Sequence, residues 1–205
     1  MTPVLWSFRR CPYAIRARLA VLQAGTPVAL REIKLSAKPE AFLAASPTGT
    51  VPCLELPDGV IDESLDIMIW ALGRNDPDGW LDTPAAGRDW IARCDGPFKH
   101  ALDRVKYASR YPDEDSTAHR AAACAFLSDL DAQIATCIFA RPTLADAAIL
   151  PFVRQFAFID KPWFDAQPWP RLQGWLERGL ASDAFARVMV KQPLWAPGHS
   201  AAVFP

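Results

Sequence analysis

Cys11 is the residue best placed for chemistry, because the segment Cys11–Ala14 lies between a predicted strand and a predicted helix. A cysteine at the helix N-cap, with Pro12 at the first helical position, faces backbone N–H groups that have no partner within the helix. Those groups and the positive end of the helix dipole favour the thiolate over the thiol. Four arginines are close in sequence: Arg9, Arg10, Arg16 and Arg18. Cations at a helix start indicate an anion to be held, so a reactive thiol is favoured over a buried, inert cysteine.

Ala14 stands where a CxxC motif would carry a second thiol. Cys11 therefore cannot resolve its own mixed disulfide and needs an external thiol, of which glutathione is the abundant one in the cytosol. Cys53 lies in a predicted strand, where a cysteine is more often a core residue than a redox partner. The five cysteines are odd in number and widely spaced, and the three histidines show no ligand spacing. The sequence thus predicts no disulfide framework and no metal site.

Glu63 and Ser64 form a second candidate position, at the start of a predicted helix. Ser64 as an N-cap is a sufficient structural explanation. The functional alternative is that the Ser64 hydroxyl and the helix N–H groups receive a ligand carboxylate, while Glu63 binds an ammonium group. Val51-Pro52 precedes a predicted strand, as a cis-proline does in thioredoxin-like domains, although an ordinary trans bond is commoner.

The hydrophobic pattern predicts an α/β first part. Strands are expected at 4–6, 28–33, 53–56 and 60–61, and helices at 12–24, 39–45 and 65–72, with Gly25 ending the first helix. Breaker residues at 73–79 indicate a linker, after which the period is helical, with helices expected at 85–110, 116–138, 143–158, 169–180 and 183–190. Thr143 and Asp146 match a capping box. We therefore predict domains at 1–74 and 84–205, joined by a linker at 75–83.

Composition excludes several classes of function. The chain has 205 residues, of which 51% are hydrophobic and 22% charged, and its net charge is −1. This balance argues against a nucleic-acid coat and against a polybasic membrane anchor. No apolar run approaches the roughly 20 residues of a spanning helix, and the N-terminus lacks a signal-peptide pattern. A cytoplasmic location is expected.

The ordered motifs resemble the cytosolic glutathione transferases, most closely the omega class and its bacterial relatives. The resemblance covers nearly the whole chain, although the chain ends earlier than many omega members. Four segments carry it: Ser7–Ala14, Ile33–Phe42, Ser46–Pro52 and Asp62–Ser64. Thr143–Asp146, before Leu150-Pro151-Phe152, resembles the capping motif of the family's helical domain.

The resemblance implies an α/β thioredoxin-like N-terminal domain and an all-α C-terminal domain. It implies Cys11 as the catalytic residue, in place of the tyrosine or serine of other classes. It also implies that Lys38 binds the glycyl carboxylate of glutathione, Val51 its cysteinyl part, and Glu63 and Ser64 its γ-glutamyl end. The complete predicted glutathione site is Tyr13, Lys38, Val51, Pro52, Glu63 and Ser64, and Phe98 and Tyr107 are expected to line a second-substrate pocket.

The leading hypothesis is a glutathione-dependent thiol transferase or dehydroascorbate-type reductase, in which Cys11 forms a mixed disulfide. One alternative is a transferase that conjugates glutathione to small electrophiles, and another is a non-enzymatic module that binds glutathione or a protein. The resemblance also implies a homodimer, with Asp66, Arg88 and Arg93 near its interface. Neither a metal, nor a nucleic acid, nor a membrane is expected as a partner.

Overall fold

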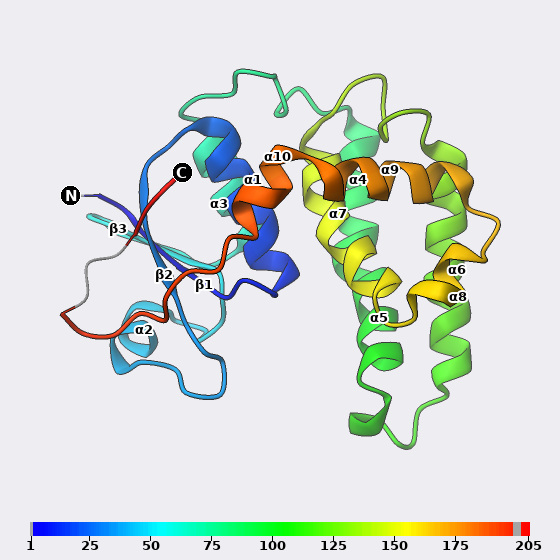
Figure 1. Ribbon diagram of the computed structural model, residues 1–205, viewed down its shortest axis with the longest axis horizontal. Coiled ribbons are helices and arrows are strands. Elements are labelled where there is room, and N and C mark those ends of the chain that lie inside the picture. The colour runs from blue at the N-terminus through cyan, green and yellow to red at the C-terminus, as the bar shows by residue number, and fades with distance from the viewer. Residues whose placement is uncertain (1, 199–201) are drawn as a thin grey trace. The chain divides into compact units, whose positions relative to one another are not determined.

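The computed structural model describes residues 2–198 and 202–205 and divides into two compact units (Figure 1). One unit comprises Met1–Leu81 with Ser182–Pro205, and the other comprises Asp82–Ala181. The first is α/β and the second is helical, which confirms the predicted fold class. Ser182–Pro205 groups with the α/β unit, whereas the sequence predicted these residues as part of the helical domain. The reason is that its helix and its strand both pack on α/β elements.

The α/β unit is built on a five-stranded sheet with the order β4-β3-β1-β2-β5. Its strands are β1 (Val4–Ser7), β2 (Val28–Glu32), β3 (Cys53–Leu56), β4 (Gly59–Ile61) and β5 (Ala202–Phe204). β1 and β2 are parallel, and the other pairs are antiparallel. The first four strands lie where the sequence predicts them. β5 was not predicted, because three residues carry no periodicity and this strand depends on its pairing with β2.

Helices cover both faces of this sheet (Figure 1). α1 (Pro12–Ala24) and α3 (Ser64–Leu72) pack together on one face, and α10 (Asp183–Val188) packs on α1. α2 (Glu40–Ala45) lies on the other face, where the rings of Phe42 and Trp6 are 5.6 Å apart between centroids. Adjacent residues of β1 point to opposite faces, so that Leu5 and Trp6 are both fully buried.

Gly25 ends α1 as predicted. Its φ of +61° lies in the left-handed region, which favours glycine, and the next residue closes the turn through Thr26 N–H donating to the Val21 carbonyl at 3.3 Å. The chain therefore reverses sharply at this point and enters β2 parallel to β1.

The helical unit contains more breaks than the sequence predicts. Its α-helices are α4 (Ala85–Arg93), α5 (Lys99–Lys106), α6 (Ser116–Gln133), α7 (Leu144–Ala157), α8 (Lys161–Asp165) and α9 (Pro170–Ala181). The single helix predicted over 85–110 is interrupted by a π-helical turn over Cys94–Phe98. Pro97 lies in this turn and has no backbone N–H to donate, which disfavours a continuous α-helical ladder. No helix in the described ranges is both long enough and apolar enough to cross a bilayer.

The predicted capping box at the start of α7 is present. The Thr143 N–H donates to Oδ2 of Asp146 at 3.0 Å. Oδ1 of the same carboxylate accepts from the Ile138 N–H at 3.0 Å and from Nε1–H of Trp175 at 2.9 Å. Asp146 therefore joins the loop before α7 to α9 as well as starting its own helix.

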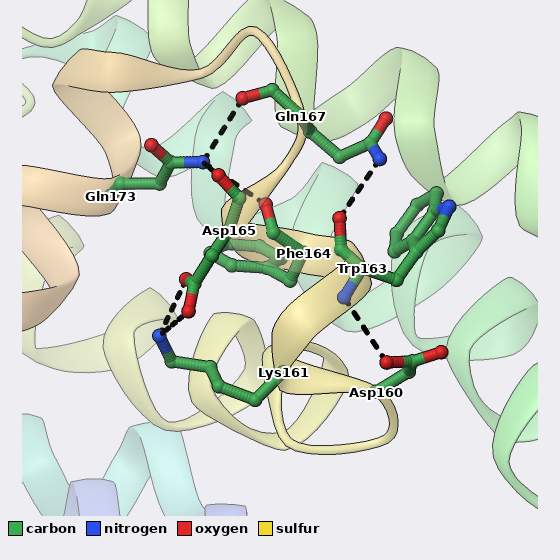
Figure 2. Close-up of polar contacts among 7 residues, drawn as sticks. All are labelled: Asp160, Lys161, Trp163, Phe164, Asp165, Gln167 and Gln173. Atoms are coloured by element: carbon green, nitrogen blue, oxygen red, sulfur yellow. Dashed lines mark hydrogen bonds and ion pairs between the residues drawn. The ribbon is translucent and has the colours of Figure 1, made fainter.

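The short helix α8 was not predicted. Figure 2 shows the polar contacts that hold it: Asp160 accepts from the Trp163 N–H at 3.1 Å, and Lys161 pairs with Asp165. Gln173, from α9, donates its amide to the carbonyls of Phe164 and Gln167, each at 3.0 Å. Five residues are too few to form a stable helix alone, so α8 depends on these contacts, including those from the neighbouring helix α9.

Candidate functional site

The α/β unit contains a pocket of about 490 Å³. Its lining comes from the start of α1, the loop after β2, the loop before β3 and the start of α3. The lining residues are Cys11, Tyr13, Leu35, Lys38, Gly49, Thr50, Val51, Pro52, Asp62, Glu63 and Ser64. The structure thus brings together every residue that the sequence proposed for a glutathione site. Leu35, Gly49, Thr50 and Asp62 are additional.

Cys11 is the N-cap residue of α1, with an extended backbone, and Pro12 follows at the first helical position. Its N–H donates to the Phe8 carbonyl at 3.0 Å, which closes the loop after β1. Its Sγ lies 3.6 Å from the Val51 carbonyl oxygen, within range of a weak S–H hydrogen bond. The thiol is half-buried. It lies between the N-terminus of α1 and the loop before β3, because Cys11 is the N-cap of α1 and its Sγ is close to Val51.

Val51 and Pro52 form the opposite wall, and the peptide bond between them is cis, as in thioredoxin-like domains. Both residues are buried. The loop before them is held by the Ser46 hydroxyl, which donates to the Thr50 carbonyl at 3.3 Å. Gly49 adopts a φ of +62° in this loop, so a side chain would be strained there.

Lys38 and Leu35 lie at the rim of the pocket. Lys38 is exposed, and the exposed fraction of Leu35 is 42%. The turn that presents them is closed by the Ala37 N–H, which donates to the Lys34 carbonyl at 3.0 Å. A lysine at this rim offers a solvated positive charge to an anionic group of a ligand.

Ser64 differs from its predicted role as an N-cap. Glu63 is the N-cap residue of α3, and Ser64 is the first helical residue. Ser64 is 2% exposed, and its hydroxyl accepts a hydrogen bond from Nε–H of Arg16 at 3.0 Å. Arg16 is also 2% exposed, and its guanidinium carbon lies 5.3 Å from the centroid of the Tyr13 ring.

Arg18 was interpreted as one of four cations that hold an anion, but it is buried inside the α/β unit. Its Nη1 lies 3.6 Å from Oε2 of Glu32, and its Nη2–H donates to the Arg9 carbonyl at 2.9 Å. Burial lowers the pKa of Arg18 to about 10 and raises the pKa of Glu32. Glu32 was not among the residues predicted from the sequence. The signal that the sequence offered was a charged residue at the end of a strand, β2, which pairs with the buried strand β1.

The remaining cysteines lie outside the pocket. Cys53 is fully buried in β3, and burial raises the pKa of its thiol to about 11. Burial also raises the pKa of the Cys124 and Cys137 thiols. Among the described residues, no group of three or more histidine, cysteine or acidic side chains could hold a metal ion.

The matches to known families follow the division of the chain into an α/β unit and a helical unit. Residues 5–78 match the family model "Glutathione S-transferase, N-terminal domain", and residues 88–178 match "Glutathione S-transferase, C-terminal domain". The chain belongs to the glutathione transferase superfamily. The N-terminal match lies within the α/β unit, and the C-terminal match lies within the helical unit.

A curated relative and two solved structures resemble this glutathione transferase. A "probable glutathione transferase" from Aplysia californica is 40% identical over 57 residues, which are 28% of this chain and 62% of the relative. Glutathione transferase Omega 3C from Trametes versicolor has a TM-score of 0.78 at 19% identity, over 96% of this chain and 92% of the other. A family member from Pseudomonas fluorescens pf-5, with two glutathione bound, has a TM-score of 0.77 at 20% identity, over 92% of each chain. At these identities the solved structures share the fold of this glutathione transferase.

The two side chains expected in a second-substrate pocket lie in the helical unit. Phe98 is 1% exposed, and its ring stacks on Phe126 with 4.5 Å between centroids. The ring of Phe98 is part of the helical core, and the pocket role expected for it stays a prediction. Tyr107 is half-buried at the end of α5, with the guanidinium of Arg110 4.4 Å from its ring centroid, and its pocket role stays a prediction.

Proposed function

We propose that this glutathione transferase acts as a glutathione-dependent thiol transferase of the omega type, with Cys11 as the nucleophile. One observation carries the proposal: Cys11 lies at the N-terminus of α1 in a pocket that holds no second cysteine. A thiol in that position is favoured as the thiolate, which is the form that attacks a disulfide. Without a resolving cysteine, an external thiol has to complete the cycle.

Glutathione fits the charges around this pocket. It has a carboxylate at each end and an ammonium group at the γ-glutamyl end. We propose that Lys38 binds the glycyl carboxylate, that the Val51 backbone pairs with the cysteinyl part, and that Ser64 and the start of α3 bind the γ-glutamyl carboxylate. Glu63 then binds the ammonium group, with Tyr13 and Pro52 completing the walls. The glutathione-bound Pseudomonas fluorescens structure, which shares this fold, supports the choice of ligand.

The proposed reaction is a pair of thiol–disulfide exchanges. The Cys11 thiolate attacks the glutathione sulfur of a glutathionylated disulfide, so that the Cys11–glutathione bond forms and the substrate sulfur leaves as a thiolate, which takes a proton. A second glutathione thiolate then attacks the glutathione sulfur of that mixed disulfide. Cys11 is released as the thiolate and oxidised glutathione is the product. In the net reaction one glutathione thiol is consumed, the substrate is released as its thiol, and the glutathione from the substrate becomes the other half of oxidised glutathione.

The test is turnover of a small glutathionylated disulfide with reduced glutathione, compared with conjugation of an aryl halide. We expect disulfide exchange by the wild type and by Cys53→Ser, the matched control, and none by Cys11→Ser, because a serine hydroxyl cannot form a mixed disulfide. Full exchange by Cys11→Ser overturns the mechanism. Conjugation without exchange favours the conjugating transferase, and neither activity with intact binding favours the binding module.

We also propose that the chain forms a homodimer and works in the cytoplasm, where reduced glutathione is abundant. The exposed side chains Asp66 and Arg88 are free to contribute to such an interface, whereas Arg93 pairs with Asp129 at 2.5 Å within its own unit. Sedimentation at micromolar concentration is expected to give twice the chain mass of 22.6 kDa. A monomer mass would contradict this part of the proposal.

A further inference from the structure

Arg16 touches the proposed glutathione site without lining it. Arg16 belongs to α1 and is 2% exposed, and its guanidinium Nε–H donates to Oγ of Ser64 at 3.0 Å. The same guanidinium lies 5.3 Å from the ring centroid of Tyr13. Ser64 and Tyr13 both line the pocket, and Arg16 does not. A buried cation therefore contacts two residues of the pocket wall, one on each of two packed helices.

The contact decides what the Ser64 hydroxyl can do. A hydroxyl has one O–H to donate and two lone pairs to accept with, whereas a guanidinium has donors and no acceptor. Because Arg16 occupies a lone pair of Oγ, the Ser64 O–H cannot point at Arg16 and has to find an acceptor elsewhere. The adjacent positive charge also polarises the hydroxyl, which strengthens it as a donor. An acceptor in the pocket, such as a carboxylate, meets a hydroxyl already set to donate.

We propose that Arg16 is a positioning residue that fixes Ser64 as the hydrogen-bond donor to the γ-glutamyl carboxylate of glutathione. Arg16 acts through Ser64 and not by touching the ligand. The consequence is specificity for ligands that carry a carboxylate at this end. The inference rests on the proposed binding of glutathione, but it does not depend on disulfide exchange being the reaction.

The test is a double-mutant cycle of Arg16→Met and Ser64→Ala, with glutathione affinity measured by titration calorimetry on the full chain. Each single variant is expected to weaken binding about 10-fold to 100-fold, the range for a lost hydrogen bond to a charged group. The double variant is expected to bind no more weakly than Ser64→Ala alone, because Arg16 acts through Ser64. Additive losses would overturn the proposal.

A second ligand separates positioning from a general loss of structure. The probe is a glutathione analogue in which hydrogen replaces the γ-glutamyl α-carboxylate. Neither Arg16→Met nor Ser64→Ala should weaken its binding, and equal weakening for both ligands would show a merely structural role. The matched control is Arg31→Met, because Arg31 packs on the rings of Trp6 and Trp195 outside the pocket and should leave both affinities unchanged.

Failure of the inference can be told from failure of the proposed function. Wild-type protein that does not bind glutathione sinks the proposed function, whereas binding with additive losses sinks only the role of Arg16. If Arg16→Met does not fold, as judged by circular dichroism, the same cycle is run with Arg16→Lys, which keeps the charge but lacks the planar Nε–H donor. An affinity unchanged by Arg16→Lys, with Ser64→Ala still weakened, would then overturn the proposal.

Discussion

Nη1 of Arg18 lies 3.6 Å from Oε2 of Glu32, and both side chains are buried behind the loop that carries Cys11. Each of them also binds the backbone of Arg9. The Arg18 Nη2–H donates to the Arg9 carbonyl at 2.9 Å, and Oε1 of Glu32 accepts from the Arg9 N–H at 2.6 Å. The pair thus fixes the backbone two residues before the proposed nucleophile, from inside the protein.

The first prediction concerns the pH dependence of stability that Glu32 brings. Burial raises the pKa of Glu32 in the native state. Between the unfolded value of about 4.3 and this higher native value, the native state holds a proton that the unfolded state has released. The contribution of Glu32 is therefore fully present below the unfolded value and is lost as the pH rises through the native one. The free energy of unfolding of the wild type should fall relative to Glu32→Gln from about pH 4 to pH 7.

Urea unfolding at a series of pH values measures this difference. Glu32→Gln is the appropriate reference because it keeps an oxygen acceptor for the Arg9 N–H and has no titrating group. Below the native pKa of Glu32 the wild type carries a neutral carboxyl at this position, so the difference between the two proteins follows the titration of Glu32. A wild type that gains stability relative to Glu32→Gln as the pH rises would mean that the ion pair outweighs burial, which contradicts the prediction.

Much of the fold could be predicted because many of its sequence signals are local. The alternation of strands and helices, Gly25 at the end of α1 and the capping box at Thr143 each depend on residues close in the chain. Two missed features depend on contacts from outside the element itself: β5 needs its pairing with β2, and α8 needs the amide of Gln173 in α9. The sequence did contain a signal for the π-helical turn, because Pro97 lies inside the predicted helix.

The candidate site was predicted from motifs whose order and spacing resemble a known family. The sequence could not show which partners the arginines bind in the folded protein. Arg16 and Arg18 are of a residue type that binds anions, yet Arg16 donates to Ser64 and Arg18 pairs with Glu32. A side chain that is polar by type is expected on the surface, and only the folded structure shows that partners from β2 and α3 make its burial tolerable.

The second prediction concerns the reactivity of Cys11. A thiol-selective alkylating agent near neutral pH should modify Cys11 before the other four cysteines and faster than a model thiol, because the α1 N-terminus favours its thiolate. Burial raises the pKa of Cys53 to about 11 and also raises the pKa of Cys124 and Cys137, so these should react slowly. Alkylation rates with peptide mapping, from about pH 5 to pH 10, measure both effects.

Cys53→Ser is the matched control for this experiment and should leave the fast phase of alkylation intact. Cys11→Ser should remove that phase while still binding glutathione, because the other proposed binding residues are unchanged. A fast phase that persists in Cys11→Ser would assign the reactive thiol to another position.

The third prediction concerns Lys38. Lys38→Ala should weaken glutathione binding by about 1–3 kcal/mol, the range for a charge-assisted hydrogen bond. The glutathione affinity of this variant should also depend much less on salt concentration than the affinity of the wild type. Its stability should stay within about 0.5 kcal/mol of the wild type, because Lys38 is exposed. The control is Lys34→Ala, an exposed lysine of the same loop outside the pocket lining. Equal weakening by both variants, measured by titration calorimetry, would indicate a general effect of charge instead of a specific contact.

The last prediction concerns Asp146, which accepts hydrogen bonds from Thr143, Ile138 and Trp175. Asp146→Ala removes the acceptor of four donors, namely the N–H and hydroxyl of Thr143, the Ile138 N–H and Nε1–H of Trp175. It should therefore lower the free energy of unfolding by about 2–4 kcal/mol. The matched control is Asp165→Ala, which removes an exposed partner of Lys161 and should cost less than about 1 kcal/mol. Urea denaturation compares the two variants. Similar losses for both would show that the carboxylate of Asp146 contributes no more than a surface ion pair. A large loss for Asp146→Ala with unchanged glutathione affinity in the folded protein would separate its role in the helical unit from ligand binding in the α/β unit.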